Sequence, residues 1–180
     1  MGGGIGMTLA VKHPNSLAKL VLMASIGSKG MVGDGFRKNV DAMQKARSNK
    51  DRKFFERDYS ADLFRPDAET EDWKTLRIRH LMNAVSDRHL IDCMKAIQAM
   101  DFTADLKNIN SPTLVLSGSV DPLLNTNLND YRRLTNACLQ VFFRAAHEAG
   151  IHETEGVAEA IHQFMQYGAL NARNFRARNL

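Results

Sequence analysis

The sequence contains few of the residues that mark disulfide-rich or membrane-spanning proteins. Among its 180 residues are two cysteines, four prolines and one tryptophan. Two cysteines, Cys93 and Cys138, are too few for a disulfide framework and indicate reduced thiols in an intracellular protein. No window approaches the roughly 18 apolar residues of a membrane-spanning helix, and no basic region precedes the short apolar run at the N-terminus. We therefore expect a cytoplasmic protein with no membrane partner.

The charged residues are mixed along the chain and leave a net charge of +4. Three arginines, Arg173, Arg176 and Arg178, crowd the last eight residues, where a solvated terminus is the better explanation. Basic and aromatic residues do not interleave as they do on nucleic-acid-binding surfaces. We expect no nucleic-acid partner.

Two parts of the chain alternate helical patterns with buried apolar runs. Residues 4–13 predict a short helix ended by Pro14, and residues 20–24 predict a strand buried on both faces. After residue 100 the patterns predict strands at 113–116 and 139–146, helices at 126–137 and 157–168, and a loop over 147–156. This alternation indicates parallel strand–helix–strand units.

The middle of the chain, residues 27–100, has a different pattern. A glycine-containing loop is followed by charged segments whose apolar residues recur at helical spacing. We predict three or four helices and no strand. The frequent Met and Phe residues here fit the packing of a helical layer better than a substrate pocket.

Two residues that could carry chemistry come directly after neighbouring predicted strands. Asp121 lies just past the strand at 113–116, and His147 lies just past the strand at 139–146. Because catalytic groups gather outside the carboxyl ends of parallel strands, we expect the two side chains to be close together. A carboxylate beside an imidazole fixes the tautomer of the ring and stabilises its protonated form. The pair would form two thirds of a nucleophilic triad.

Alternatives to this pair exist within the same loop. His152 could be the base instead, although His147 directly follows the strand. The string HEAGIH resembles the zinc motif H-E-x-x-H but is one residue too long, and Gly150 opposes a helix there. The glycines at 2–6 match no phosphate-binding loop. We expect no metal and no cofactor.

Several segments, in this order, resemble the α/β-hydrolase family, in its cap-bearing esterase and carbon–carbon hydrolase branch. The opening MGGGIGMTLAVKHPNSLAKLVLMAS resembles the stretch that comes after the serine of the G-x-S-x-G elbow. DLKNINSPTLVLSGSVDPLL resembles the strand and loop of the acid, and VFFRAAHEAGIHETEGVAEAIHQFM resembles the last strand, the histidine loop and the last helix. The resemblance implies a partial α/β-hydrolase fold, with about three parallel strands, flanking helices and an inserted helical cap. It divides the chain into an elbow helix and strand (1–26), a cap (27–100) and the C-terminal part of the core (101–180).

The same resemblance implies roles for four residues. Asp121 would be the acid, His147 the base, Met1 a donor of the oxyanion hole and Gly2 the small residue of the elbow. The match begins one residue after the serine, so the chain as given lacks the nucleophile and the earlier strands. Ala146 stands where the family usually has glycine, a change that would crowd the loop.

Two functions are implied by the resemblance. The first is hydrolysis of an ester, a lactone or a carbon–carbon bond of a small apolar substrate, once the missing part is supplied. The second is a non-catalytic binding or assembly module on a truncated hydrolase scaffold. In the second case the edge of the strand at 18–24 would lie exposed, and a dimer through that edge or association with a separate N-terminal half would cover it. Three strands with helices on one face would leave a half-covered core of marginal stability.

Overall fold

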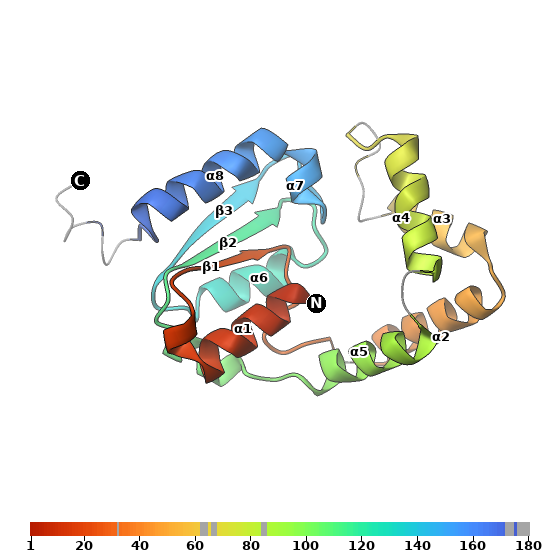
Figure 1. Ribbon diagram of the computed structural model, residues 1–180, viewed down its shortest axis with the longest axis horizontal. Coiled ribbons are helices and arrows are strands. Elements are labelled where there is room, and N and C mark those ends of the chain that lie inside the picture. Colours follow the sequence, from red (N-terminus) through yellow and green to blue (C-terminus); the bar gives the residue numbers. More distant parts are fainter. Residues whose placement is uncertain (32, 62–64, 66–67, 84–85, 172–174, 176–180) are drawn as a thin grey trace.

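The computed structural model describes residues 1–31, 33–61, 65, 68–83, 86–171 and 175. The described residues form a three-stranded sheet between helices and a group of four further helices beside it (Figure 1). Arg173, Arg176 and Arg178 lie outside the described residues. No helix in the described part of the chain combines the length and the apolar composition needed to cross a membrane.

The sheet consists of β1 (Leu20–Met23), β2 (Thr113–Gly118) and β3 (Ala137–Phe142), which are parallel and lie in the order β1-β2-β3. The predicted parallel sheet is confirmed. The central strand β2 is buried at every residue. The third strand begins two residues earlier than predicted and ends at Phe142 instead of residue 146. It ends there because its last partner, Gly118, is the last residue of β2, and the next side chain, Phe143, is 85% exposed.

Helices cover both faces of the sheet, which corrects the expectation that one face would be bare. On one face lie α1 (Gly2–Lys12), the 3-10 helices η1 (Pro14–Ser16) and η2 (Thr103–Asn108), and α6 (Leu124–Tyr131). On the other face lie α7 (Ala149–His152) and α8 (Thr154–Tyr167), as Figure 1 shows.

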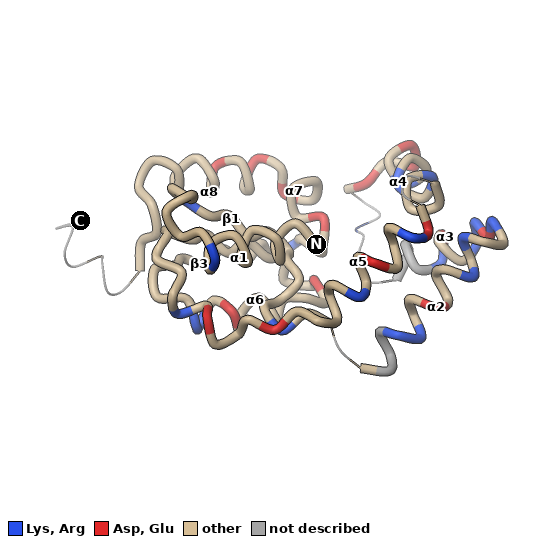
Figure 2. Tube along the Cα trace, turned by 60° about the horizontal axis from the view of Figure 1, so that its bottom comes forward, with Lys and Arg blue, Asp and Glu red and all other residues tan. Residues whose placement is uncertain are grey.

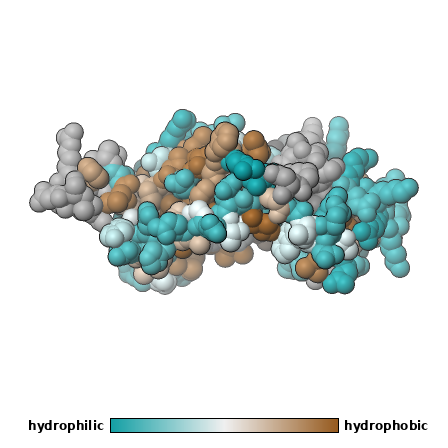
Figure 3. All heavy atoms as spheres, turned by 90° about the horizontal axis from the view of Figure 1, so that it is seen from above, coloured by the Kyte–Doolittle hydropathy of each residue, from teal (hydrophilic) through white to brown (hydrophobic). Residues whose placement is uncertain are grey.

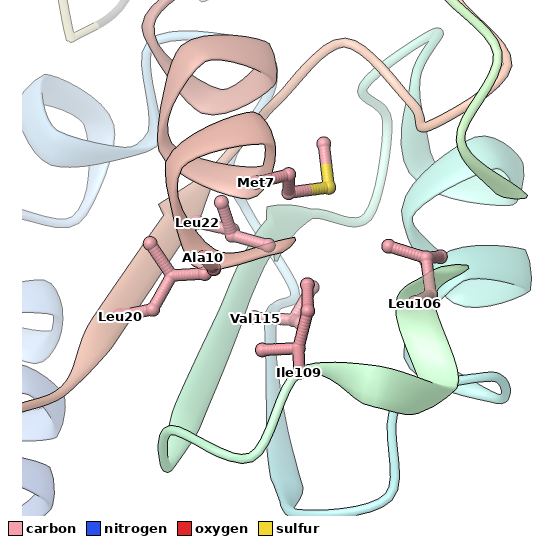
Figure 4. Packing of buried hydrophobic residues seen from close by; sticks show 7 residues of the cluster. All are labelled: Met7, Ala10, Leu20, Leu22, Leu106, Ile109 and Val115. Carbon is pink, nitrogen blue, oxygen red and sulfur yellow. The ribbon is translucent and has the colours of Figure 1, made fainter. Parts of the chain in front are cut away.

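Two apolar cores result because successive residues of β2 point to opposite faces of the sheet. Val115 packs in one core and Leu114 and Leu116 pack in the other. The first core, drawn in Figure 4, contains Met7, Ala10, Leu20, Leu22, Leu106, Ile109 and Val115. The second contains Leu114, Leu116, Ala145, Ala149, Val157, Phe164 and Ala169.

Several helix bounds differ from the predictions: α1 begins two residues and α8 three residues earlier than predicted. The helix predicted at 126–137 begins two residues earlier and ends at Tyr131. The segment predicted as a loop contains α7, so the prediction that Gly150 opposes a helix is wrong. Glycine inside a helix costs about 1 kcal/mol relative to alanine. Here the neighbouring Ala149 is fully buried against the sheet, and tertiary packing of this kind overrides the weak local preference.

The middle of the chain forms α2 (Asp34–Ser48), α3 (Arg52–Ala61), α4 (Glu71–Asn83) and α5 (Asp87–Ala99). We call residues 34–99 the helical segment. Its described residues contain four helices and no strand, as predicted. It has a small core of its own around Ala46, Phe55 and Ile78. Lys and Arg are frequent on α2 and α3 (Figure 2). On the face drawn in Figure 3 the helical segment is mainly hydrophilic, whereas apolar residues gather on the part of the molecule that contains the sheet.

Candidate active site

Asp121 lies in the turn that follows β2. Its side chain is fully buried, and Oδ1 accepts a hydrogen bond from the Leu123 N–H at 2.9 Å. The same oxygen lies 3.3 Å from Nδ1 of His147. The other oxygen, Oδ2, is buried and has no hydrogen-bond partner among the described residues. The carboxylate is therefore held by its own turn and presented to a single imidazole.

His147 lies in the loop that follows β3, and this loop packs closely on the end of β2. Two backbone hydrogen bonds join the two strand ends, from Ser119 N–H to the Phe142 carbonyl and from Val120 N–H to the Ala145 carbonyl. A Cβ added to Gly118 would lie 2.2 Å from the Ala145 carbonyl oxygen, so only glycine permits this approach. The structure thus brings together the two side chains that the sequence predicted to meet, with His147 29% exposed.

A cavity of about 420 Å³ lies beside His147. It is lined by Met1, Gly2, Gly3, Met23, Ala24, Ser25, Arg77, His147, Glu148, Gly150 and Ile151. The start of α1, the end of β1 and the His147 loop therefore surround one space. Met1 and Gly2 lie in this cavity, but their assignment to an oxyanion hole and an elbow stays a prediction. A Cβ on Gly3 would lie 2.2 Å from Cβ of Ser25, which explains a glycine where α1 closely approaches the residues after β1.

His152, the alternative base, is placed differently. Its side chain is fully buried. Nδ1 accepts from the Ala146 N–H at 3.0 Å, and Nε2 lies 2.5 Å from Oε1 of Glu69. Both ring nitrogens are therefore occupied by protein groups, which leaves His147 as the imidazole that reaches the cavity.

A buried polar network links the end of β1 to α6, close to the Asp121 turn. Asp130 accepts hydrogen bonds from the N–H and the hydroxyl of Ser28, both at 2.7 Å. Asn127 donates to the Ser25 carbonyl at 3.1 Å, and its Oδ1 lies 3.3 Å from the Ser25 hydroxyl. Ser25 lines the cavity, but its hydroxyl is engaged in this network.

Three groups around His147 were not predicted from the sequence. Arg77 and Glu148 form an ion pair of 3.0 Å at the cavity wall, and Glu69 pairs with His152. Arg77 and Glu69 come from the helical segment, about 70 or more positions from the residues they meet. No local motif marks them, so only the packing of the chain reveals them.

A larger cavity, of about 770 Å³, lies between α1 and α5 and shares only Met1 with the cavity beside His147. Size alone would favour it as a binding site. It contains neither Asp121 nor His147, however, so the smaller cavity is the better candidate for chemistry. Within the described ranges, no group of three or more His, Cys, Asp or Glu side chains could hold a metal ion.

Known proteins with a similar structure are found, although no protein-family model and no curated protein sequence matches the chain. An α/β hydrolase enzyme from a Medee basin deep-sea metagenome library is 18% identical and aligns with a TM-score of 0.75 over 94% of this chain and 64% of its own. An esterase from Exiguobacterium antarcticum is 18% identical, with a TM-score of 0.76 over 91% of this chain and 63% of its own. An enol-lactonase from Burkholderia xenovorans is also 18% identical, with a TM-score of 0.75 over 92% of this chain and 63% of its own.

The chain spans less than two thirds of the length of each of these solved structures. At this level of identity the likeness establishes the fold and not the activity. The three parallel strands, the helices on both faces and the alignment over nine tenths of this chain agree with one another. The predicted resemblance is therefore confirmed at the level of structure: this chain has the α/β-hydrolase fold.

Proposed function

We propose that Asp121 and His147 are the acid and the base of a triad that hydrolyses an ester, a lactone or an activated carbon–carbon bond. The observation that carries this proposal is the 3.3 Å contact between Asp121 Oδ1 and His147 Nδ1 at adjacent strand ends. A buried carboxylate on Nδ1 orients the ring and stabilises the imidazolium, while the opposite ring nitrogen is left to take a proton from a nucleophile. His147 faces the cavity and Asp121 does not, which fits this division of roles.

The nucleophile of this proposal is the serine that the resemblance places directly before Met1. The start of α1 and His147 line the same cavity, so a residue that precedes Met1 would be attached at the wall of this cavity. The Met1 N–H, at the beginning of α1, would then donate to the oxyanion of the tetrahedral intermediate. Gly2 is the small residue that the resemblance assigns to this turn, and a Cβ added to it would meet no described atom within 4 Å.

The cavity supports a small substrate with an apolar portion. Met1, Met23 and Ile151 supply apolar surface, while the Arg77–Glu148 ion pair forms a polar wall. We propose that residues 27–100 act as a cap, because Arg77 on α4 closes one side of the cavity. Solved structures with this fold include an esterase, an enol-lactonase and an N-acyl homoserine lactone degrading enzyme, and esters or lactones are the substrates we propose first.

The test begins with the coding sequence directly upstream of Met1. A reading frame that continues into Gly-x-Ser supplies the longer polypeptide, whose hydrolysis of p-nitrophenyl acetate is then measured. We expect His147→Ala and Asp121→Asn each to lower kcat by about 10³- to 10⁴-fold, as loss of a triad member does. The exposed residue His162 provides the control, since His162→Ala should leave kcat unchanged. Activity that survives His147→Ala would remove His147 from the mechanism.

A second candidate function is an assembly module without catalysis. Among the described residues β1 pairs with β2 alone, so its other edge keeps unpaired backbone groups. Large apolar side chains of α1, Ile5 and Leu9, are exposed, as is Met23 at the end of β1. A second copy of the chain or a separate N-terminal half would cover these groups.

Sedimentation equilibrium of the chain tests this alternative. A module that pairs through this side should dimerise, and Ile5→Lys should weaken the dimer at least tenfold, because a charge would be buried. Leu76→Lys is the control, since Leu76 is similarly exposed but lies on α4. A monomer at all concentrations would contradict pairing between copies. The cytoplasmic location expected from the cysteine content stays a prediction.

A further inference from the structure

The buried ring of His152 can exist in only one tautomer. Its Nδ1 accepts a hydrogen bond from the Ala146 N–H at 3.0 Å, so Nδ1 carries no proton. The proton of the neutral ring therefore lies on Nε2, which donates to Oε1 of Glu69 at 2.5 Å. The Arg65 N–H also approaches Nε2, but at 3.4 Å this contact is too long to compete with the Glu69 carboxylate. A doubly protonated ring would set two donors against each other at Ala146.

The two partners of His152 lie in different parts of the chain, and one of them is next to His147. Ala146 directly precedes His147, and its carbonyl oxygen would lie 2.4 Å from a Cβ on Gly118, so this residue is wedged against the end of β2. Glu69 lies in the segment just before α4, in the helical segment. His152 thus connects the backbone next to the proposed base with a residue that is distant in the chain.

Further contacts between the same two stretches flank His147. The Arg65 guanidinium donates to the Arg144 carbonyl at 2.6 Å and pairs with the Glu153 carboxylate at 3.0 Å. Arg77 pairs with Glu148 at 3.0 Å. Residues on both sides of His147 are therefore held by Arg65 and Arg77. Of these contacts, only that of His152 is fully buried and reaches the backbone amide beside His147.

We propose that His152 is a positioning residue, which holds the Ala146 amide with one ring nitrogen and Glu69 with the other, and so makes the placement of His147 depend on the helical segment. This inference rests on the proposed function for the role of His147 as a base, but the linkage itself does not require catalysis. Its consequence is that the helical segment and His147 move together. Displacing the segment would release Ala146 and loosen the contact between His147 and Asp121.

The experiment is heteronuclear NMR on the full chain, with ¹⁵N-labelled histidine. In the wild-type protein we expect the His152 ring to carry its proton on Nε2 and none on Nδ1. Two variants each keep one of the two hydrogen bonds of the His152 ring and remove the other. His152→Asn keeps an acceptor near the Nδ1 position for Ala146, and His152→Gln keeps a donor near the Nε2 position for Glu69. Loss of one buried hydrogen bond corresponds to about a tenfold change in an equilibrium.

Hydrogen exchange of the Ala146 amide should therefore become about tenfold faster in His152→Gln and change by less than about threefold in His152→Asn. The ring signals of His147 should move in His152→Gln and also in Glu69→Leu, although residue 69 is far from His147 in the sequence. Glu69→Gln keeps an acceptor for Nε2 and should restore them. His162→Gln, at an exposed position of α8, is the control and should change neither readout.

A wild-type His152 with a proton on Nδ1 would overturn the proposal, and this measurement needs no variant to fold. Unchanged His147 signals in folded Glu69→Leu would overturn it as well. These readouts are independent of hydrolysis. If they are observed while the longer polypeptide is inactive, the proposed function has failed and the linkage stands. If the polypeptide hydrolyses esters and the signals do not move, the linkage has failed and the triad stands.

Discussion

Replacing Gly118 by alanine should separate the acid and base strands at the point where they are closest. The added Cβ would lie 2.2 Å from the Ala145 carbonyl oxygen and 2.4 Å from that of Ala146. Cβ atoms essentially never approach other heavy atoms within 3.0 Å, so the loop must move by most of an ångström. The obstructing atoms belong to the backbone and cannot rotate away as a side chain would. We therefore expect a loss of about 3 kcal/mol in the free energy of unfolding, at the upper end of overpacking effects.

Urea unfolding of the chain, followed by circular dichroism, measures this loss. Gly150→Ala is the matched control, because the nearest atom to its added Cβ is a flexible Met23 carbon at 3.5 Å, an ordinary contact. The control should lie within about 1 kcal/mol of the wild type, on the stabilising side, since α7 gains a better helix former. In a longer, active polypeptide, a displacement of this size between His147 and Asp121 should lower kcat by about 100-fold. Equal stability of Gly118→Ala and Gly150→Ala would refute the reasoning.

Three further predictions concern the surroundings of the site. Asp130→Ala should lower the free energy of unfolding by about 3 kcal/mol, because the Ser28 N–H and hydroxyl lose a buried carboxylate acceptor. The control in the same urea experiment is Asp92→Ala, which breaks an exposed ion pair with Arg88 and should lower the free energy of unfolding by less than about 0.5 kcal/mol. Similar losses in both variants would contradict this account. Burial raises the pKa of the Cys138 thiol. Its alkylation by iodoacetamide, measured by mass spectrometry, should therefore reach half its maximal rate at a higher pH in the folded than in the urea-unfolded protein. A lower midpoint in the folded protein would be evidence against this burial. Hydrogen bonds from the Thr103 N–H, and then from the Thr103 side chain, lower the pKa of Asp101, so any stability from these contacts is present above the unfolded-state pKa and is lost as the pH falls through the folded-state value. An NMR titration should find the Asp101 carboxyl below the ordinary aspartate range and partly restored in Thr103→Val, and an ordinary value in the wild type would show that these hydrogen bonds do not form.

Much of the sheet and the meeting of Asp121 with His147 could be predicted because they depend on local patterns. A run of apolar residues such as Thr113–Leu116 marks a strand that is buried on both faces, whatever packs on it. Once such strands are parallel, the residues that come after them must gather at one edge of the sheet. The same logic predicted the helical character of residues 34–99, where charged and apolar residues alternate at helical spacing.

Local patterns do not contain the contacts that join distant parts of the chain. The period of an amphipathic helix states which side is apolar but not which neighbour covers it, so the second helical layer on the sheet was missed. Gly150 disfavours a helix by local preference, yet burial of Ala149 supports α7. Likewise nothing near residue 69 or residue 77 in the sequence indicates that these side chains lie against the histidine loop.

The sequence by itself determined the order of the three strands along the chain, and from it the edge of the sheet at which a carboxylate and an imidazole would appear. Only the tertiary structure decided which of the two histidines faces the cavity. His147 and His152 lie five positions apart in one loop, and both are possible bases by composition. The choice between them depends on the Ala146 amide and on Glu69, which occupy both nitrogens of His152 and leave His147 beside Asp121. The physical reason is that a ring's protonation and access are set by the groups packed around it, and those groups come from parts of the chain whose meeting no local pattern encodes.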